Sequence, residues 1–134
     1  MFVKTRYHRV LLAVGLLASV SLAAEAADRV RPGQWEQTIT VAGRTIAKST
    51  CLTQSDAEAI NGDAPSIKAY AEKVSAPAAC KVSDVTITGN QVVITSVCAS
   101  GKENVGTTTY HGDRFETVNT NGTTSQAKWV GACK

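Results

Sequence analysis

Short alternating segments separated by turn residues constrain the fold of this chain more than any other feature. Segments such as 35–41 (WEQTITV) and 81–88 (KVSDVTIT) alternate apolar and polar side chains, which is the pattern of a half-buried strand. Pairs of turn residues such as Gly89 and Asn90 join neighbouring segments. Because such short connections can join only antiparallel neighbours, the sequence predicts an antiparallel sheet.

Strand patterns recur along most of the chain. The many threonines in these segments agree with a strand prediction, because β-branched side chains favour strands. The strand-like segments are 35–41, 45–51, 81–88, 91–98, 105–111, 114–119 and 124–130. We therefore predict a mainly β fold, either a curled antiparallel sheet or a small barrel of about seven strands. A short helical insert between Cys51 and Cys80 is expected to cover one face or end.

The helical insert begins with a capping signal. Thr53 followed three residues later by Asp56 resembles a capping box, and the alanines after them favour helix. We expect a first helix over residues 54–60, which the Asn-Gly pair at 61–62 ends. A second helix is expected over residues 66–74, capped by Ser66. Its apolar face would consist of Ile67, Tyr70 and Val74.

The first 26 residues have the three-part layout of a secretory signal peptide. A basic start (MFVKTRYHR) precedes an apolar run of about 15 residues and the small residues AEAA. The run is shorter than the roughly 20 residues that span a bilayer, which disfavours the alternative of an uncleaved anchor. We predict a signal peptide at 1–26, a single exported β-rich domain at 27–134, and a periplasmic or secreted location without a stable membrane anchor.

The charge of the mature chain excludes one class of partner. Loss of the signal peptide removes Lys4, Arg6, Arg9 and Glu25, which leaves 11 basic and 10 acidic residues. No cluster of Lys and Arg remains in the mature part. Because nucleic-acid binding needs a basic stripe, we expect no nucleic-acid partner.

Four cysteines, Cys51, Cys80, Cys98 and Cys133, lie in the predicted exported domain. An even number of cysteines in a small exported domain predicts disulfides, here two with three possible pairings. We favour Cys51–Cys80 and Cys98–Cys133, because each closes a local excursion of about 30 residues. A zinc site is disfavoured, because no two cysteines are spaced as CxxC and His111 is the only histidine of the mature chain. We expect no metal and no cofactor.

Catalytic residues are hard to identify in this sequence. A nucleophilic triad needs a histidine base, and the one candidate, His111, lies beside a turn where an exposed structural role is expected. A pair of carboxylates is the other option for a hydrolase. The acidic candidates lie on different strands or loops and are Glu36, Asp84, Glu103 and Glu116. We therefore expect no catalytic residue and a protein that is not an enzyme.

Aromatic residues form the main candidate for a core cluster or a ligand site, namely Trp35, Tyr110, Phe115 and Trp129. Trp35 and Trp129 lie on the first and last strands, which become neighbours if the sheet closes. Buried aromatic side chains dominate small cores, which favours the core role. The alternative is an apolar pocket in the mouth of the barrel.

Five motifs in order resemble the bacterial exported family catalogued as domain of unknown function 3617. They are RPGQWEQTITVAGR (31–44), CLT (51–53), CKVSDVTITGNQVVITSVC (80–98), GTTTYHGDRFE (106–116) and GAC (131–133). The likeness covers residues 31–133. It implies export, a compact β-rich domain and paired cysteines, and it implies no activity.

Export and a set of strands without catalytic residues favour a non-catalytic domain that binds a protein or a small apolar ligand. Two alternatives come from other classes. One is a lysozyme-inhibitor-like regulator of a cell-wall hydrolase, and the other is a carboxylate-based hydrolase.

Overall fold

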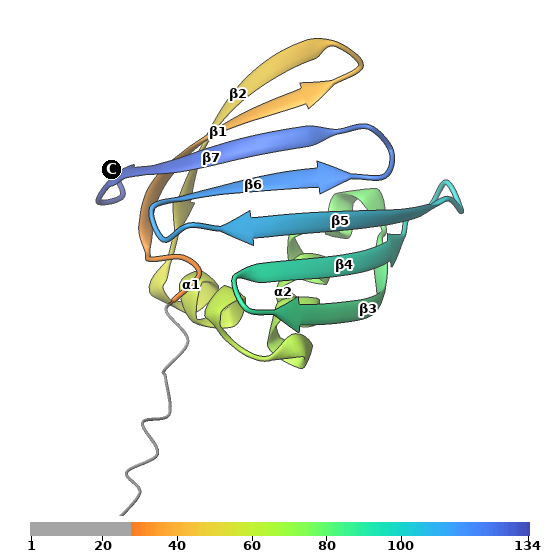
Figure 1. The fold of residues 1–134 in the computed structure, drawn as a ribbon, viewed down its shortest axis with the longest axis horizontal. Helices are drawn as coiled ribbons and strands as arrows, with labels where there is room; N and C mark the ends of the chain where they lie inside the picture. Colours follow the sequence, from red (N-terminus) through yellow and green to blue (C-terminus); the bar gives the residue numbers. More distant parts are fainter. Residues whose placement is uncertain (1–27) are drawn as a thin grey trace, which may run out of the picture.

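The computed structural model describes residues 28–134, which form one seven-stranded sheet and two short helices (Figure 1). The strands are β1 (Gly33–Val41), β2 (Arg44–Leu52), β3 (Lys81–Thr88), β4 (Gln91–Val97), β5 (Glu103–Tyr110), β6 (Arg114–Asn119) and β7 (Thr124–Gly131). The helices are α1 (Gln54–Asn61) and α2 (Ala64–Val74), with a 3-10 turn η1 (Ala76–Ala78) after α2. The predicted signal peptide at 1–26 lies outside the described residues.

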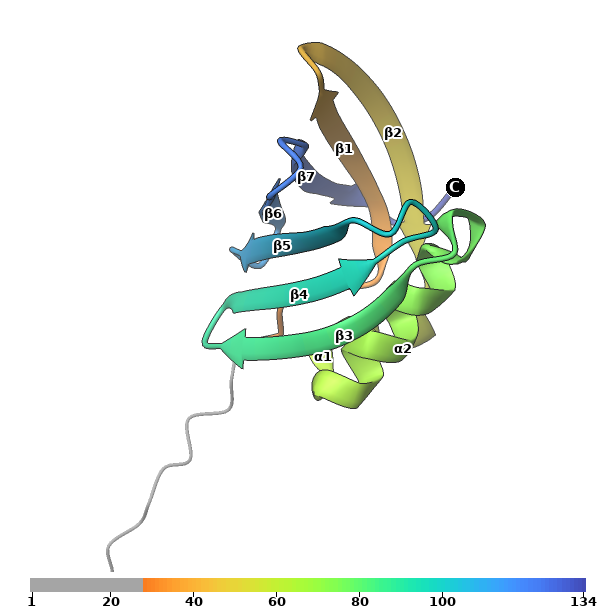
Figure 2. The same ribbon diagram turned by 90° about the vertical axis from the view of Figure 1, so that its right-hand side faces the viewer.

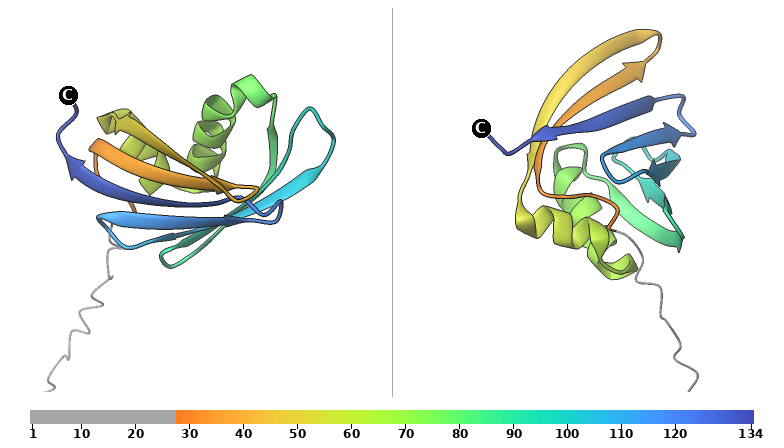
Figure 3. Two further views of the ribbon diagram at one scale, coloured as in Figure 1. Left: turned by 90° about the horizontal axis from the view of Figure 1, so that it is seen from above. Right: turned by 60° about the vertical axis from the view of Figure 1, so that its left-hand side comes forward.

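The sheet is antiparallel throughout, with the order β2-β1-β7-β6-β5-β4-β3. It curls strongly but does not close, so β2 and β3 remain as two edges. Figures 2 and 3 show α1 and α2 inside the curve of the sheet, with α2 alongside β3. The prediction of a mainly β fold with a helical insert is confirmed, and the curled sheet is the correct form of the two that the sequence allowed. The first and last strands pair directly without closure of a barrel.

Alternation along each strand separates two environments. On β1, Trp35 and Gln37 face the concave side of the sheet, whereas Glu36 and Thr38 face the convex side. The main core cluster combines the concave face with the helices and the segment before β1, and it consists of Val30, Trp35, Leu52, Ala57, Ile60 and Ala127. The core therefore lies between the sheet and the helical insert.

The predicted capping box of α1 is present. The Thr53 side chain accepts a hydrogen bond from the backbone N–H of Asp56, and the Asp56 carboxylate accepts one from the backbone N–H of Thr53. The predicted cap of α2 is wrong. Asp63 is the N-cap, and its carboxylate accepts hydrogen bonds from the backbone N–H and the hydroxyl of Ser66. The helix begins earlier because Pro65 fits the first turn, where its missing N–H is not needed.

The segment before β1 is fixed against α1. The side-chain amide of Asn61 donates to the Val30 carbonyl at 2.7 Å and accepts from the Val30 N–H at 2.9 Å. The Arg29 guanidinium donates to the carbonyls of Ile60 and Gly62 at the C-terminal end of the helix. A cation at this end also interacts favourably with the helix dipole.

The corner before Trp35 requires a glycine. Gly33 has a φ of +134°, and a Cβ atom at this position would lie 2.4 Å from both the Gly131 carbonyl oxygen and the Trp129 Nε1. The corner therefore brings β1 close to the end of β7. The β1–β7 pairing is irregular here, with a register shift between Gln34 and Trp35.

The predicted disulfide pairing is wrong. The disulfides join Cys51 to Cys133 and Cys80 to Cys98. The pairing follows the order of the strands rather than distance along the chain. Cys51 lies opposite Gln34 on β1, and Gln34 lies opposite Gly131 at the end of β7, which places the last cysteine beside β2.

The second disulfide closes the β3–β4 hairpin. Cys80 immediately precedes β3 and Cys98 immediately follows β4, and the adjacent residues Lys81 and Val97 are partners in the register. Each disulfide therefore fastens one edge strand of the open sheet. Disulfides of this kind are typical of oxidising, extracellular environments.

Candidate ligand-binding pocket

An apolar pocket of about 330 Å³ lies between the concave face of the sheet and the helices. We call it the concave pocket. Its volume falls near the lower end of the range of about 300–1,000 Å³ for small-molecule sites. The pocket is therefore large enough to admit a small molecule.

The sheet side of the pocket is aromatic. The rings of Trp35 and Phe115 lie 5.3 Å apart between centroids, and those of Tyr110 and Phe115 lie 5.5 Å apart. Trp35 is 2% exposed and belongs to the core as well as to the pocket wall. Three of the four predicted aromatic residues thus lie together, and they belong to or pack against the main core cluster as well as line the pocket.

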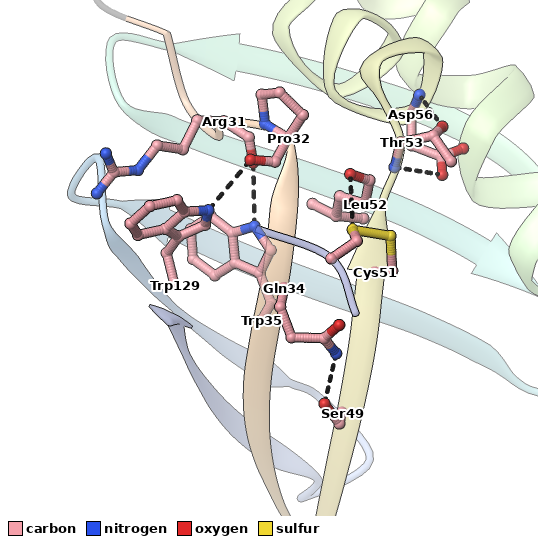
Figure 4. The surroundings of a disulfide bond; sticks show 11 residues. Arg31, Pro32, Gln34, Trp35, Ser49, Cys51, Leu52, Thr53, Asp56 and Trp129 are labelled. Carbon is pink, nitrogen blue, oxygen red and sulfur yellow. Dashed lines mark hydrogen bonds between the residues drawn. A yellow bond between two sulfur atoms is a disulfide. The ribbon is translucent and has the colours of Figure 1, made fainter. Parts of the chain in front are cut away.

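Trp129, the fourth predicted aromatic residue, is not part of the pocket wall. It lies opposite Trp35 in the β1–β7 register, but its indole N–H donates to the Pro32 carbonyl, whereas that of Trp35 donates to the Arg31 carbonyl (Figure 4). The Arg31 guanidinium lies 3.6 Å from the centroid of the Trp129 ring. Trp129 therefore secures the chain at the corner before β1.

The helix side of the pocket comes from the predicted apolar face of α2. Ile67, Tyr70 and Val74 all line the pocket, together with Ile60 from α1. Ile67 is buried, whereas Val74 is 56% exposed at the end of the helix. The wall therefore changes from a covered interior at Ile67 to an open mouth at Val74.

Six of the sixteen residues that line the pocket have polar side chains, namely Gln37, Lys48, Thr50, Tyr70, Thr108 and Tyr110. Burial raises the pKa of Tyr110 to about 12 against the opposing effect of the Arg29 charge, and burial with the nearby Asp56 charge raises the pKa of Tyr70. Both phenols therefore stay protonated at neutral pH. Burial and nearby charges cause both pKa shifts, and within residues 28–134 no hydrogen bond to either hydroxyl is among the causes. The two hydroxyls are polar groups that a bound molecule can use.

Lys48 is the only charged side chain among the residues that line the pocket in the described part of the chain. It lies on β2, opposite Gln37 of β1, and is exposed. Its position was not predictable from the sequence, because residues 45–51 contain one large apolar side chain and give little signal of a buried face. Only the curl of the sheet brings β2 over the pocket.

A second depression lies on the convex face, where charged side chains of β1, β6 and β7 meet. We call it the convex groove; its charged residues are Glu36, Arg114, Glu116 and Lys128, and His111 also lines it. His111 Nε2 lies 3.6 Å from a carboxylate oxygen of Glu116. The groove brings together two of the four predicted carboxylates, whereas Asp84 lies on β3 and Glu103 begins β5.

Residues 28–134 contain no group of three or more His, Cys, Asp or Glu side chains arranged to hold a metal ion. No helix of this part of the chain is long and apolar enough to cross a membrane.

Comparison with known proteins identifies a family. No curated protein and no solved structure matched the chain. Residues 30–133 match the family described as "Protein of unknown function (DUF3617)". The matched range includes the whole sheet and both helices. The resemblance seen in the five sequence motifs is thereby confirmed. The chain belongs to the DUF3617 family.

Proposed function

We propose that this protein is a non-catalytic, periplasmic or secreted domain that holds a small apolar ligand in the concave pocket. The observation that carries the proposal is the pocket itself, with core side chains on both its sheet side and its helix side. An apolar ligand gains free energy by leaving water for such a site. The predicted signal peptide and the two disulfides support the exported location.

The chemistry of the walls favours this class of ligand over a polar one. The side chains of Phe115 and Ile67 have no hydrogen-bonding group, and the indole N–H of Trp35 already donates to the Arg31 carbonyl. Beside these three side chains, a polar group of a ligand would lose its water without replacement, at a cost of about 1–3 kcal/mol for each group. Each methylene group buried instead contributes about 0.8 kcal/mol, or about a fourfold gain in affinity.

A pair of matched variants tests the proposal. Val74 at the pocket mouth is 56% exposed and Val118 on the convex side of the sheet is 58% exposed. Because both sites tolerate a large side chain at the surface, Val74→Trp and Val118→Trp should fold equally well. The probe is N-phenyl-1-naphthylamine, an uncharged dye whose emission rises in apolar surroundings.

We expect the wild type and Val118→Trp to bind the dye with the same affinity. Val74→Trp should bind at least tenfold more weakly, because the indole occupies the mouth. Circular dichroism and urea unfolding of the three proteins check that each is folded. Equal dye binding by both variants, or no binding by the wild type, would remove the concave pocket as the site.

The convex groove carries the alternative of a carboxylate-based hydrolase. Glu36 and Glu116 both line it, which is the one observation in favour of that activity. A screen with glycoside and ester substrates tests it, with Glu36→Gln and Glu116→Gln as variants. We expect no turnover by the wild type, whereas turnover lost in either variant would replace our proposal with a hydrolase.

A further inference from the structure

We infer that the ligand is a single-chain amphiphile with an anionic headgroup, its chain in the concave pocket and its headgroup beside Lys48. The inference rests on the proposed function and names the class of ligand. It depends on three observations, namely the position of Lys48, the absence of an ion pair to it within residues 28–134, and the differences in exposure and charge among the residues that line the pocket.

The position of Lys48 follows from the alternation along β2. Thr50 and Leu52 line the same pocket, so every second residue from Lys48 to the end of the strand faces it. Leu52 is 6% exposed, whereas Lys48 is exposed. The long side chain can keep its methylene groups on the apolar wall and its ammonium group in water at the mouth.

Within residues 28–134, no ion pair neutralises the charge of Lys48. The ion pairs of the described residues join Lys68 to Glu72, Lys73 to Asp56 and His111 to Glu116, and none includes Lys48. The first two of these pairs engage acidic groups of the helical insert. A bound anion at the mouth would therefore meet an unpaired cation.

The lining residues differ in exposure and charge. Val30, Ile60 and Ile67 are apolar and buried, with exposed fractions of 2%, 9% and 5%. Lys48 is charged and exposed on the edge strand β2. A molecule that matches both parts of the lining has an apolar chain and a charged headgroup. The small volume of the pocket, about 330 Å³, favours one chain over two.

The experiment compares probes that share one chain and differ in the headgroup. The probes are dodecanoate, dodecyl phosphate, dodecanol and dodecyltrimethylammonium, each titrated below its micelle concentration by calorimetry. Lys48→Gln removes the charge and keeps most of the side chain. Arg44→Gln is the matched control, because Arg44 lies at the other end of the same strand and outside the pocket wall.

We expect the two anions to bind most tightly and the quaternary ammonium most weakly. Lys48→Gln should weaken both anions about threefold, as for a solvent-exposed ion pair, and change dodecanol less than twofold. Arg44→Gln should change none of the four. High salt should reduce the preference for anions in the wild type and leave dodecanol unaffected.

The outcomes separate this inference from the proposed function. Equal affinity for dodecanol and the anions, or an unchanged preference in Lys48→Gln, overturns the anionic headgroup and leaves the apolar pocket in place. Failure of all four probes together with the uncharged dye overturns both. A preference for dodecanoate over dodecyl phosphate, or the reverse, identifies the headgroup as a carboxylate or a phosphate.

Discussion

Trp35 and Glu36 are neighbours on β1, yet the sheet places them in opposite environments. Trp35 is 2% exposed and contacts the helix-covered core, whereas Glu36 is exposed on the convex face among other charged side chains. The helices lie only inside the curve. A single layer of sheet therefore buries side chains only on the face that a second layer covers.

Loss of the disulfides, which fasten the sheet outside the concave pocket, should have the largest effect on stability. Cys51–Cys133 spans 82 residues and Cys80–Cys98 spans 18, which in the chain-entropy model correspond to about 4.5 and about 3 kcal/mol. We expect the double variant Cys51→Ala/Cys133→Ala to lose more unfolding free energy than Cys80→Ala/Cys98→Ala, as measured by urea unfolding. The reverse order would show that the entropy of the unfolded chain does not govern their contribution.

Substitution of the two neighbours on β1 tests the comparison directly. Trp35→Ala should cost about 4 kcal/mol of unfolding free energy, because it leaves a cavity in the main core. Glu36→Ala should change stability by less than about 0.5 kcal/mol, since it removes an exposed side chain away from the core. Urea unfolding of both variants measures the difference. Similar losses in the two would mean that the concave face is not the stabilising one.

Local signals account for the part of the fold that the sequence predicted. The alternation in residues 81–88 depends on neighbouring residues alone, and β3 has those bounds. The capping box at Thr53 is equally local. By contrast, the partner of Cys51 depends on which strands lie side by side, and pairing of β1 with β7 joins residues from opposite ends of the chain. A preference for local pairing could not find it.

The candidate site, like the fold, was predictable from the sequence only in part. Tyr110, Phe115 and the α2 face stood out because large apolar side chains mark buried positions. Lys48 did not, because residues 45–51 contain one large apolar side chain and give little signal of a buried face. Its proximity to the pocket depends on the curl of the whole sheet, which no short segment encodes.

Loss of the capping box should have an intermediate effect on stability. It tests the concave side, because α1 is part of the layer that covers this face. Thr53→Ala removes the side chain that accepts from the Asp56 N–H and should cost about 1 kcal/mol. Thr53→Ser should restore stability to within a few tenths of a kcal/mol, because serine is an equally good N-cap. Thermal and urea unfolding check both. An equal loss in the serine variant would assign the effect to the methyl group rather than to the cap.

The smallest effect concerns the response of the helical cover to acid. The hydrogen bond from Lys73, with those at Thr53, holds the pKa of Asp56 below its ordinary value of 3.8, although desolvation acts in the other direction. A carboxyl group with a lowered pKa in the folded state stabilises the fold above pH 3.8, and this contribution is lost as pH falls through the folded-state value. We expect Asp56→Asn to unfold with a shallower dependence on pH below about pH 4 and an unchanged dependence near neutral pH. Glu36→Gln on the convex face is the control and should keep the wild-type slope. Urea unfolding from neutral pH to about pH 2 measures both, and an unchanged slope in Asp56→Asn would show that the Lys73–Asp56 contact does not stabilise the helical layer.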